Sequence, residues 1–279
     1  MSQDLPVLVD RVLGELGDRI EDKYRHFARR VFANGTTAYE RRLAQYAFIG
    51  HARVLDAGCG FGQWSLALAR HNRQVAAVDV SPARIAALRA LAGRLSVDNL
   101  TALSGSIDAL PFRSASFDAV FCYGVIFLTP WREALRELVR VLAPGGRLYV
   151  NANGLGWYKF LWFTEHNRGS GYEPKEVAAK VLLNTLRYHR GDPIERGADI
   201  LIDPDELTAE LRSLDCAAIE IAAEGSAARG TYRGPVTPPF FIGEYRGERG
   251  VYEILASKGR KTDVAPSGRI SSELVDAGR

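Results

Sequence analysis

The sequence predicts an α/β protein in which helices cover both faces of a parallel sheet. Short apolar runs typical of buried strands recur along the middle of the chain, at 53–57, 74–80, 100–103, 117–122 and 147–151. Amphipathic helical patterns lie between them, at 63–71, 82–92 and 131–142. Because strands that alternate with helices join through right-handed crossovers, this order predicts a parallel sheet.

Helices are also expected outside this region. Apolar side chains recur every three or four residues from Leu5 to Phe32, which predicts one long helix, and the pattern over 37–49 predicts a second. After the fifth strand the regular alternation breaks. The later patterns predict two helices and two strands, at 175–188, 205–214, 217–222 and 251–256.

The composition is that of a globular protein without disulfides or a structural metal. The chain has 279 residues, of which 47% are hydrophobic and 25% charged, and its formal net charge is +3. Cys59, Cys122 and Cys216 lie far apart and lack the spacing of a zinc or redox site. We find no signal-peptide pattern and no run near the roughly 18 apolar residues of a membrane span. We therefore expect a cytoplasmic protein with no metal and no stable membrane insertion.

The segment that points to chemistry is the glycine-rich turn after the first predicted strand, Gly58-x-Gly60-x-Gly62, which Asp56 precedes. Ligands of parallel sheets bind where strands end, and glycines let the backbone approach them. Dinucleotide binders use the different spacing G-x-G-x-x-G. A carboxylate at position 56 would oppose a pyrophosphate but suit an ammonium group. The turn therefore favours a ligand with an amino-acid end, such as S-adenosylmethionine.

A second carboxylate, Asp79, ends the next predicted strand. An acid at this position can accept hydrogen bonds from both hydroxyls of a ribose. Because S-adenosylmethionine and dinucleotides both carry an adenosine ribose, Asp79 does not distinguish between them.

Between residues 54 and 150 the sequence closely resembles the class I S-adenosylmethionine-dependent methyltransferases. The matching stretches are VLDAGCGFG (54–62), AAVDVSPARI (76–85), SIDALPFRSASFDAVFC (106–122) and LRELVRVLAPGGRLYV (135–150). The resemblance implies a Rossmann-like, seven-stranded, mostly parallel sheet with strand order 3-2-1-4-5-7-6. In that scheme 217–222 is strand 6, and 251–256 is strand 7, which runs antiparallel.

The resemblance also implies a division of the chain. Residues 1–50 are expected to form an N-terminal helical cap and 51–258 the methyltransferase domain. Within that domain, 152–200 and 225–250 are insertions near the site of the methyl acceptor. Residues 259–279 are expected to be a polar, flexible tail.

Carried over by position, the family pattern places the cofactor on two strand ends and one loop. The implied cofactor-binding residues are Asp56, Gly58, Cys59, Gly60, Gly62, Asp79, Val80, Ser106 and Ile107. This chain departs from the family at Ser106, where many relatives have an acid that accepts the adenine amino group. A hydroxyl accepts that hydrogen bond more weakly, and Asp108 is the alternative acceptor.

These residues imply methyl transfer to a small molecule, and we expect an oxygen of a sugar or polyketide-like metabolite. His166, in the first insertion, and Tyr123, just past the fourth strand, are the candidate catalytic bases. The alternatives are N-methylation of a small amine, an NAD(P)-dependent oxidoreductase, and a cofactor-binding protein without catalysis. A net charge of only +3 and the lack of an RNA-binding module argue against nucleic acid. A homodimer contact through the N-terminal helices is a further alternative.

Two other features allow more than one interpretation. The aromatic cluster at 157–163 predicts packing under the insertion, a lid over a ring-shaped acceptor, or a patch that touches a membrane or partner. Four arginines, Arg229, Arg233, Arg246 and Arg249, are the basic residues of the 225–250 segment, which has only two acids. They predict either an exposed hairpin or contacts to a phosphate or carboxylate of the acceptor.

Overall fold

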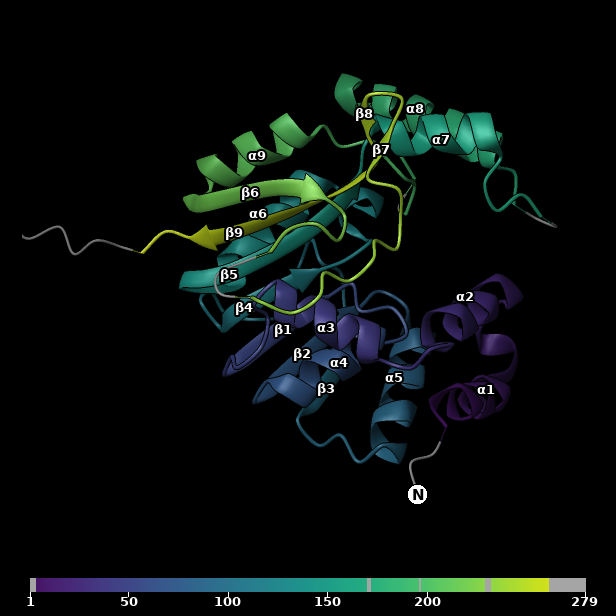
Figure 1. Cartoon of the computed structure of the whole chain (residues 1–279), viewed down its shortest axis with the longest axis vertical. Coiled ribbons are helices and arrows are strands. Elements are labelled where there is room, and N and C mark those ends of the chain that lie inside the picture. The colour runs from purple at the N-terminus through teal and green to yellow at the C-terminus, as the bar shows by residue number, and fades with distance from the viewer. Residues whose placement is uncertain (1–3, 170–171, 196, 229–231, 261–279) are drawn as a thin grey trace, which may run out of the picture.

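The computed structural model describes residues 4–169, 172–195, 197–228 and 232–260, and Figure 1 presents its architecture. The expected tail falls outside the described residues from position 261 onward, as does Arg229. No helix in the described ranges is long and apolar enough to cross a membrane.

A single seven-stranded sheet forms the centre of the molecule. Its strands are β1 (Arg53–Ala57), β2 (Gln74–Asp79), β3 (Leu100–Ser104), β4 (Phe117–Cys122), β5 (Leu142–Asn153), β6 (Cys216–Ala223) and β9 (Val251–Lys258). They lie in the order β3-β2-β1-β4-β5-β9-β6. β9 pairs antiparallel with both β5 and β6, while the pairs from β3 to β5 are parallel. The predicted fold, including the strand order, is therefore confirmed, with β9 as the seventh strand.

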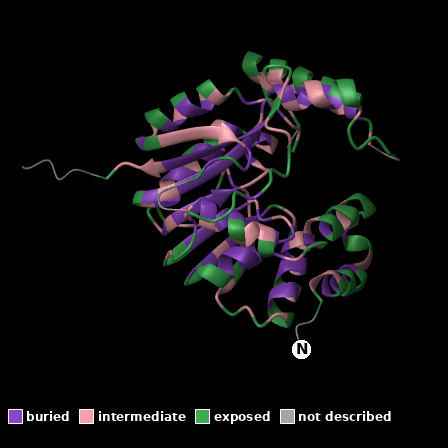
Figure 2. Cartoon of the chain, viewed as in Figure 1, coloured by how far each residue is buried: buried purple, intermediate pink, exposed green. Residues whose placement is uncertain are grey.

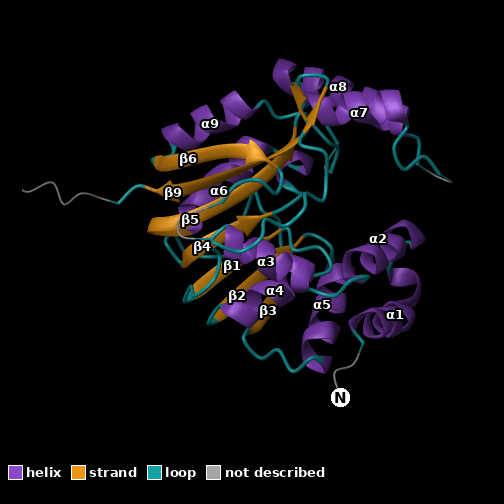
Figure 3. Ribbon diagram, viewed as in Figure 1, coloured by secondary structure: helices purple, strands orange, loops and turns teal. Residues whose placement is uncertain are grey.

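Helices cover both faces of the sheet, as Figure 3 shows. The helices next to the sheet are α3 (Thr37–Gln45), α4 (Gln63–His71), α5 (Pro82–Arg94), α6 (Trp131–Val141) and α9 (Pro204–Ser213). Alternate residues of one strand point to opposite faces, so a strand covered on both sides is apolar throughout. In β4, for example, Ala119 and Phe121 join the core beneath α3 and α4, whereas Val120 and Cys122 join the core beneath α6.

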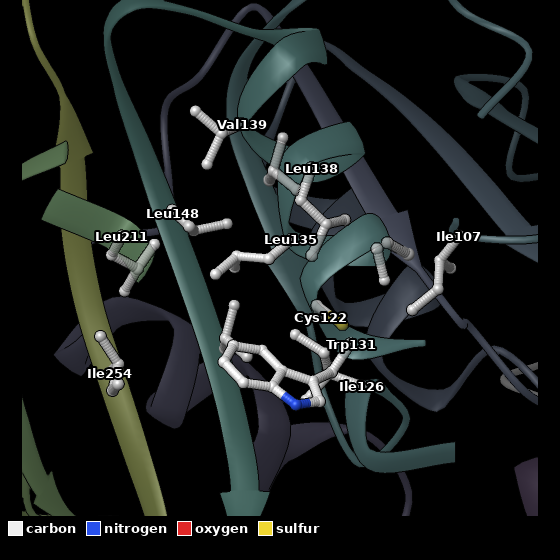
Figure 4. Packing of buried hydrophobic residues seen from close by; sticks show 14 of the residues in the cluster. Ile107, Cys122, Ile126, Trp131, Leu135, Leu138, Val139, Leu148, Leu211 and Ile254 are labelled. Atoms are coloured by element: carbon white, nitrogen blue, oxygen red, sulfur yellow. The ribbon is translucent and has the colours of Figure 1, made fainter. Parts of the chain in front are cut away.

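The core beneath α6 is the largest apolar cluster. In Figure 4, Leu135 and Leu138 of α6 point toward β5, where Leu148 lies, and Trp131 closes one end of the cluster. Figure 2 shows that buried residues concentrate in the sheet and on the inward helix faces. Because both faces of the sheet are filled in this way, the open positions for a ligand are at the ends of its strands.

The N-terminal helical region differs from the prediction of one continuous helix over 5–32, which is wrong. The chain forms α1 (Leu5–Leu16), a short turn η1 (Gly17–Arg19) and α2 (Asp22–Phe32). Gly17 has a φ of +52°, which ends α1. The Arg25 guanidinium donates to the carbonyls of Leu13 (2.9 Å) and Ile20 (3.0 Å), so it satisfies backbone acceptors at the break. The apolar side chains of α1 pack against α5.

The insertion after β5 forms a helical pair, α7 (Leu155–Thr164) and α8 (Pro174–Arg190). The sequence did not predict α7, because aromatic residues on all sides obscure its helical period. Its first turn lies against a small hairpin of β7 (Glu244–Tyr245) and β8 (Glu248–Arg249). A Cβ at Gly156 would lie 2.2 Å from the Glu248 carbonyl oxygen, so only glycine permits this approach. Figure 1 shows α7 and α8 beside this hairpin.

Candidate active site

The carboxyl ends of β1, β2, β4 and β5 meet at one edge of the sheet. In Figure 1 this edge faces right, with α2 below it and α7 above it. The predicted glycine turn, Asp79 and Tyr123 all lie at this edge, since each follows or ends one of these strands.

The glycine turn connects β1 to α4 through three left-handed residues. Gly58, Gly60 and Gly62 have φ values of +78°, +56° and +90°. The Val78 carbonyl of β2 accepts hydrogen bonds from the amides of Gly58 (2.8 Å) and Cys59 (2.9 Å). A Cβ would lie 2.4 Å from Val125 Cγ1 at Gly58 and 2.1 Å from Leu88 Cδ1 at Gly62, whereas Gly60 has open space around that position. The outer glycines thus fix the turn, and Gly60 is the point where a ligand can approach the backbone.

Asp79 is held rigidly beside this turn. Its side chain is almost fully buried, with Oδ2 accepting from the Gly60 amide (3.0 Å) and Oδ1 from the Ser81 amide (2.9 Å). Arg84 Nη1 lies 3.7 Å from Oδ1. The next residue, Val80, is 58% exposed although it is apolar. A carboxylate fixed next to an exposed apolar side chain suits a ribose joined to an aromatic base.

Asp56 is the most unusual group at the edge. It is 1% exposed and accepts a hydrogen bond from Ser65 Oγ at 2.5 Å. Burial, assisted by the nearby charge of Asp79, raises its pKa to about 7 despite the opposing hydrogen bond from Ser65. Gln63 Oε1, one residue past the turn, is buried with no hydrogen-bond partner among the described residues. An ammonium group donates to carboxylate and amide oxygens, so the chemistry of these two acceptors fits the amino-acid end of S-adenosylmethionine.

The loop after β3 completes the predicted cofactor site. The Gly105 amide donates to the Asp79 carbonyl at 3.0 Å, which holds the loop against the end of β2. Ser106 is half-buried, and the Ile107 side chain is buried in the core beneath α6. Ile107 can therefore offer only its backbone amide to a ligand. The contact between Ser106 or Asp108 and adenine stays a prediction.

Tyr123 is bound to a buried ion pair that the sequence did not reveal. Glu224 Oε1 accepts from Arg42 Nη1 (2.6 Å) and from the Tyr123 hydroxyl (3.0 Å). Glu224 Oε2 accepts from the backbone amides of Phe240 (2.8 Å) and Phe241 (3.3 Å). Burial, with the adjacent Glu224 charge, raises the pKa of Tyr123 well above its ordinary value. The phenol therefore stays protonated near neutral pH, which opposes its predicted role as a base.

A second buried carboxylate, Glu253, lies in the middle of β9. It accepts from the hydroxyls of Tyr46 and Tyr149 and from the Ala227 amide. Gln45 donates to the carbonyls of Gly225 and Ala227, so α3 and the segment after it anchor the chain after β6. The sequence does carry a signal for Glu253, since it is an acid within an otherwise apolar strand that is covered on both faces.

Aromatic rings extend from this ion pair toward the insertion. The Trp64 ring centroid lies 4.8 Å from those of Tyr39 and Tyr123, and Phe240 lies 5.5 Å from Tyr39. Phe240 and the adjacent Phe241 are more than a third exposed. Phe241 in turn contacts Trp157 of α7 at 5.6 Å. Part of the aromatic cluster of the insertion is thus packed inside the molecule. Another part contacts the exposed rings near Tyr123.

The other predicted residues lie farther out. His166 is exposed just past α7, with its ring against Phe160 (5.0 Å) and Trp157 (6.1 Å). The Arg246 guanidinium lies 4.2 Å from the centre of the Phe163 ring. Arg233 and Arg249 are exposed. Contacts of His166 or these arginines with an acceptor remain predictions.

Known proteins match the segment of the chain that contains the glycine turn. A family model described as a methyltransferase domain matches residues 54–146. The "Ubiquinone biosynthesis O-methyltransferase" of Xanthomonas oryzae pv. oryzae is 37% identical over 103 residues, which are 36% of this chain and 42% of that protein. The chain thus spans about two fifths of the length of this curated relative.

Solved structures share the fold over most of the chain. A geranyl diphosphate methyltransferase in complex with S-adenosylmethionine aligns with a TM-score of 0.56 and 16% identity, over 88% of this chain and 94% of that one. The [4+2]-cyclase SpnF aligns with a TM-score of 0.53 and 19% identity, over 91% and 93%. One of these proteins is named for methyl transfer and the other for a cyclisation, so the shared fold alone does not define the reaction.

Proposed function

We propose that this chain, whose residues 54–146 match a family model described as a methyltransferase domain, is a class I S-adenosylmethionine-dependent methyltransferase that transfers a methyl group from that cofactor to a small molecule. One observation supports the proposal above others. The glycine turn, Asp56 and Asp79 converge at the carboxyl edge of the sheet, with the Gly60 amide bonded to Asp79. The site therefore combines a carboxylate for an amino-acid end with a second carboxylate for a ribose.

In this proposal each residue has a defined part. Asp56 and the Gln63 amide oxygen bind the ammonium group, and Asp79 accepts from the ribose hydroxyls. Val80 packs against adenine, and Ile107 donates its amide to the ring. When bound, S-adenosylmethionine supplies an activated methyl group on a sulfonium. The chain then aligns the acceptor with that carbon, an effect worth roughly 7–11 kcal/mol in well-oriented systems.

We propose a hydroxyl oxygen of a ring-bearing metabolite, such as a sugar or polyketide-like product, as the acceptor. The exposed rings of Phe240 and Phe241 beside Tyr123 support a ring-shaped molecule. A relative named for O-methyltransfer in ubiquinone biosynthesis supports oxygen over nitrogen. Tyr123 stays protonated in this proposal and orients the acceptor. His166 remains the candidate base.

Two assays test the proposal. Titration calorimetry should detect binding of S-adenosylmethionine to the wild-type protein and a loss of at least tenfold in affinity for Asp79→Ala. Asp98→Ala, which removes an exposed carboxylate before β3, is the matched control and should bind normally. Release of S-adenosylhomocysteine is then screened against sugars, phenols and amines. Binding of reduced NAD(P) in place of S-adenosylmethionine would favour the oxidoreductase, and turnover of amines alone would favour N-methylation.

A further inference from the structure

A cavity outside the cofactor site lies between α8 and the segment that follows it. Its volume is about 630 Å³. Lys180, Asn184 and Arg187 of α8 line it, and their spacing of four and three residues places them on one stripe of the helix. Glu195 and Asp199, from the segment after α8, also line it. The cavity thus combines two basic and two acidic side chains with an apolar part.

The Asp199 carboxylate lacks a compensating group. The structure places no hydrogen bond or ion pair between this carboxylate and any residue in the described ranges. The side chain is half-buried, and that burial raises its pKa to about 6. Lys180 and Arg187 are exposed and likewise form no ion pair within the described chain. With Glu195, four charged groups line the cavity, and none of them belongs to an ion pair of the described ranges.

Contacts of Asp199 and the residue after it connect the cavity to the carboxyl edge of the sheet. The Ile200 amide donates to the Phe127 carbonyl (3.0 Å), in the turn that follows β4. Burial and the charge of Asp199 both raise the pKa of Tyr158, whose hydroxyl accepts from Asn153 Nδ2 (3.4 Å) at the end of β5. Asp199 thus lies close to groups that contact the ends of β4 and β5.

We propose that this cavity is a second ligand site, separate from the acceptor position beside Tyr123, and that its ligand is a hydroxyl-bearing organic acid. Asp199 accepts a hydrogen bond from its hydroxyl, and Lys180 and Arg187 bind its carboxylate. Leu183, which is 48% exposed, contacts its apolar body. This assignment rests on the charges and lining of the cavity and not on the proposed function.

Three matched probes test this cavity in the full chain. 3-(4-Hydroxyphenyl)propanoate carries both groups, 3-phenylpropanoate lacks the hydroxyl, and 4-ethylphenol lacks the carboxylate. We expect the first probe to bind most tightly by ligand-observed NMR. Asp199→Ala should weaken binding of the two phenols about tenfold and spare 3-phenylpropanoate. Arg187→Gln should weaken binding of the two acids and spare 4-ethylphenol.

Controls separate this proposal from the proposed function. Asp192→Ala and Arg190→Gln remove exposed charges of the same segment and helix, and should leave the affinity for every probe unchanged. S-adenosylmethionine should bind equally to all variants. No binding of any probe to the wild-type protein at millimolar concentration, or identical probe affinities in Asp199→Ala and Arg187→Gln, would overturn the cavity assignment. If the wild-type protein does not bind S-adenosylmethionine, that result would instead overturn the proposed function.

Discussion

At the scale of single residues, Asp56 combines a structural cost with a binding role. A carboxylate buried this deeply is expensive to ionise, and its pKa near 7 reflects that cost. A bound ammonium group favours the ionised form, so the binding free energy of the ligand and the protonation of Asp56 are linked.

This linkage predicts a pH dependence of cofactor affinity. Lowering the pH from 7.5 to 6 protonates most of the Asp56 carboxylate, so the affinity for S-adenosylmethionine should fall roughly tenfold. Asp56→Asn should bind weakly at both pH values, because it lacks the titrating charge. Titration calorimetry at the two pH values measures both effects, and an unchanged wild-type affinity would contradict the role of Asp56.

Alanine substitutions at two glycines of the turn should have opposite effects, one mainly on stability and the other mainly on cofactor binding. Gly62→Ala places a Cβ against Leu88 in a left-handed conformation, and should cost roughly 2–4 kcal/mol of unfolding free energy. Gly60→Ala has space for its Cβ, so it should cost only about 1 kcal/mol but weaken S-adenosylmethionine binding at least tenfold. Gly50→Ala has a similar φ and open space before β1, and serves as the control for backbone cost. Urea unfolding and calorimetry distinguish the three variants.

The site residues that could be predicted from the sequence are those that neighbouring strands bring together. Asp56 and Asp79 end neighbouring strands, so strand pairing alone brings their sequence segments together. Glu224 and Arg42 could not be paired in this way, because they lie 182 residues apart and only the folded chain joins them. The environment of Tyr123 depends on the same pair, because its hydroxyl donates to Glu224.

At the scale of elements, α3 and the segment after β6 are held together by the buried Arg42–Glu224 pair. This pair also holds the backbone of Phe240 and Phe241, which carry exposed rings near Tyr123. Elements with strong periodicity or clear end signals, such as α4 and β4, have the predicted bounds. The break at Gly17 and the aromatic helix α7 were missed, since the first retains its apolar stripe and the second lacks one.

Substitutions that break the Arg42–Glu224 pair test how much it stabilises the fold. Arg42→Met leaves Glu224 buried without a cation and should lower the unfolding free energy by about 3–5 kcal/mol. The double variant Arg42→Met, Glu224→Gln should recover part of that loss, because no uncompensated charge remains. Arg94→Met removes an exposed pair with Glu15 and should cost less than about 1 kcal/mol. Equal losses for the buried and exposed pairs in urea unfolding would refute this account.

At the scale of the whole molecule, the fold is shared with proteins that have different activities, so the ligand must identify the function. A ligand that binds only the folded state stabilises it by about 2.7 kcal/mol at one hundred times its dissociation constant. For a chain of this size, S-adenosylmethionine should therefore raise the melting temperature by roughly 5–10 °C. Reduced NAD(P) at the same concentration should leave it unchanged, as measured by differential scanning fluorimetry.

The central claim is that S-adenosylmethionine binds at the glycine turn and the end of β2. Hydrogen–deuterium exchange with and without this cofactor tests it most directly. We predict slower exchange in peptides that cover 54–64 and 76–85, and unchanged exchange in a peptide that covers 94–99 before β3. Protection confined to other segments, or no protection at saturating cofactor, would contradict the claim.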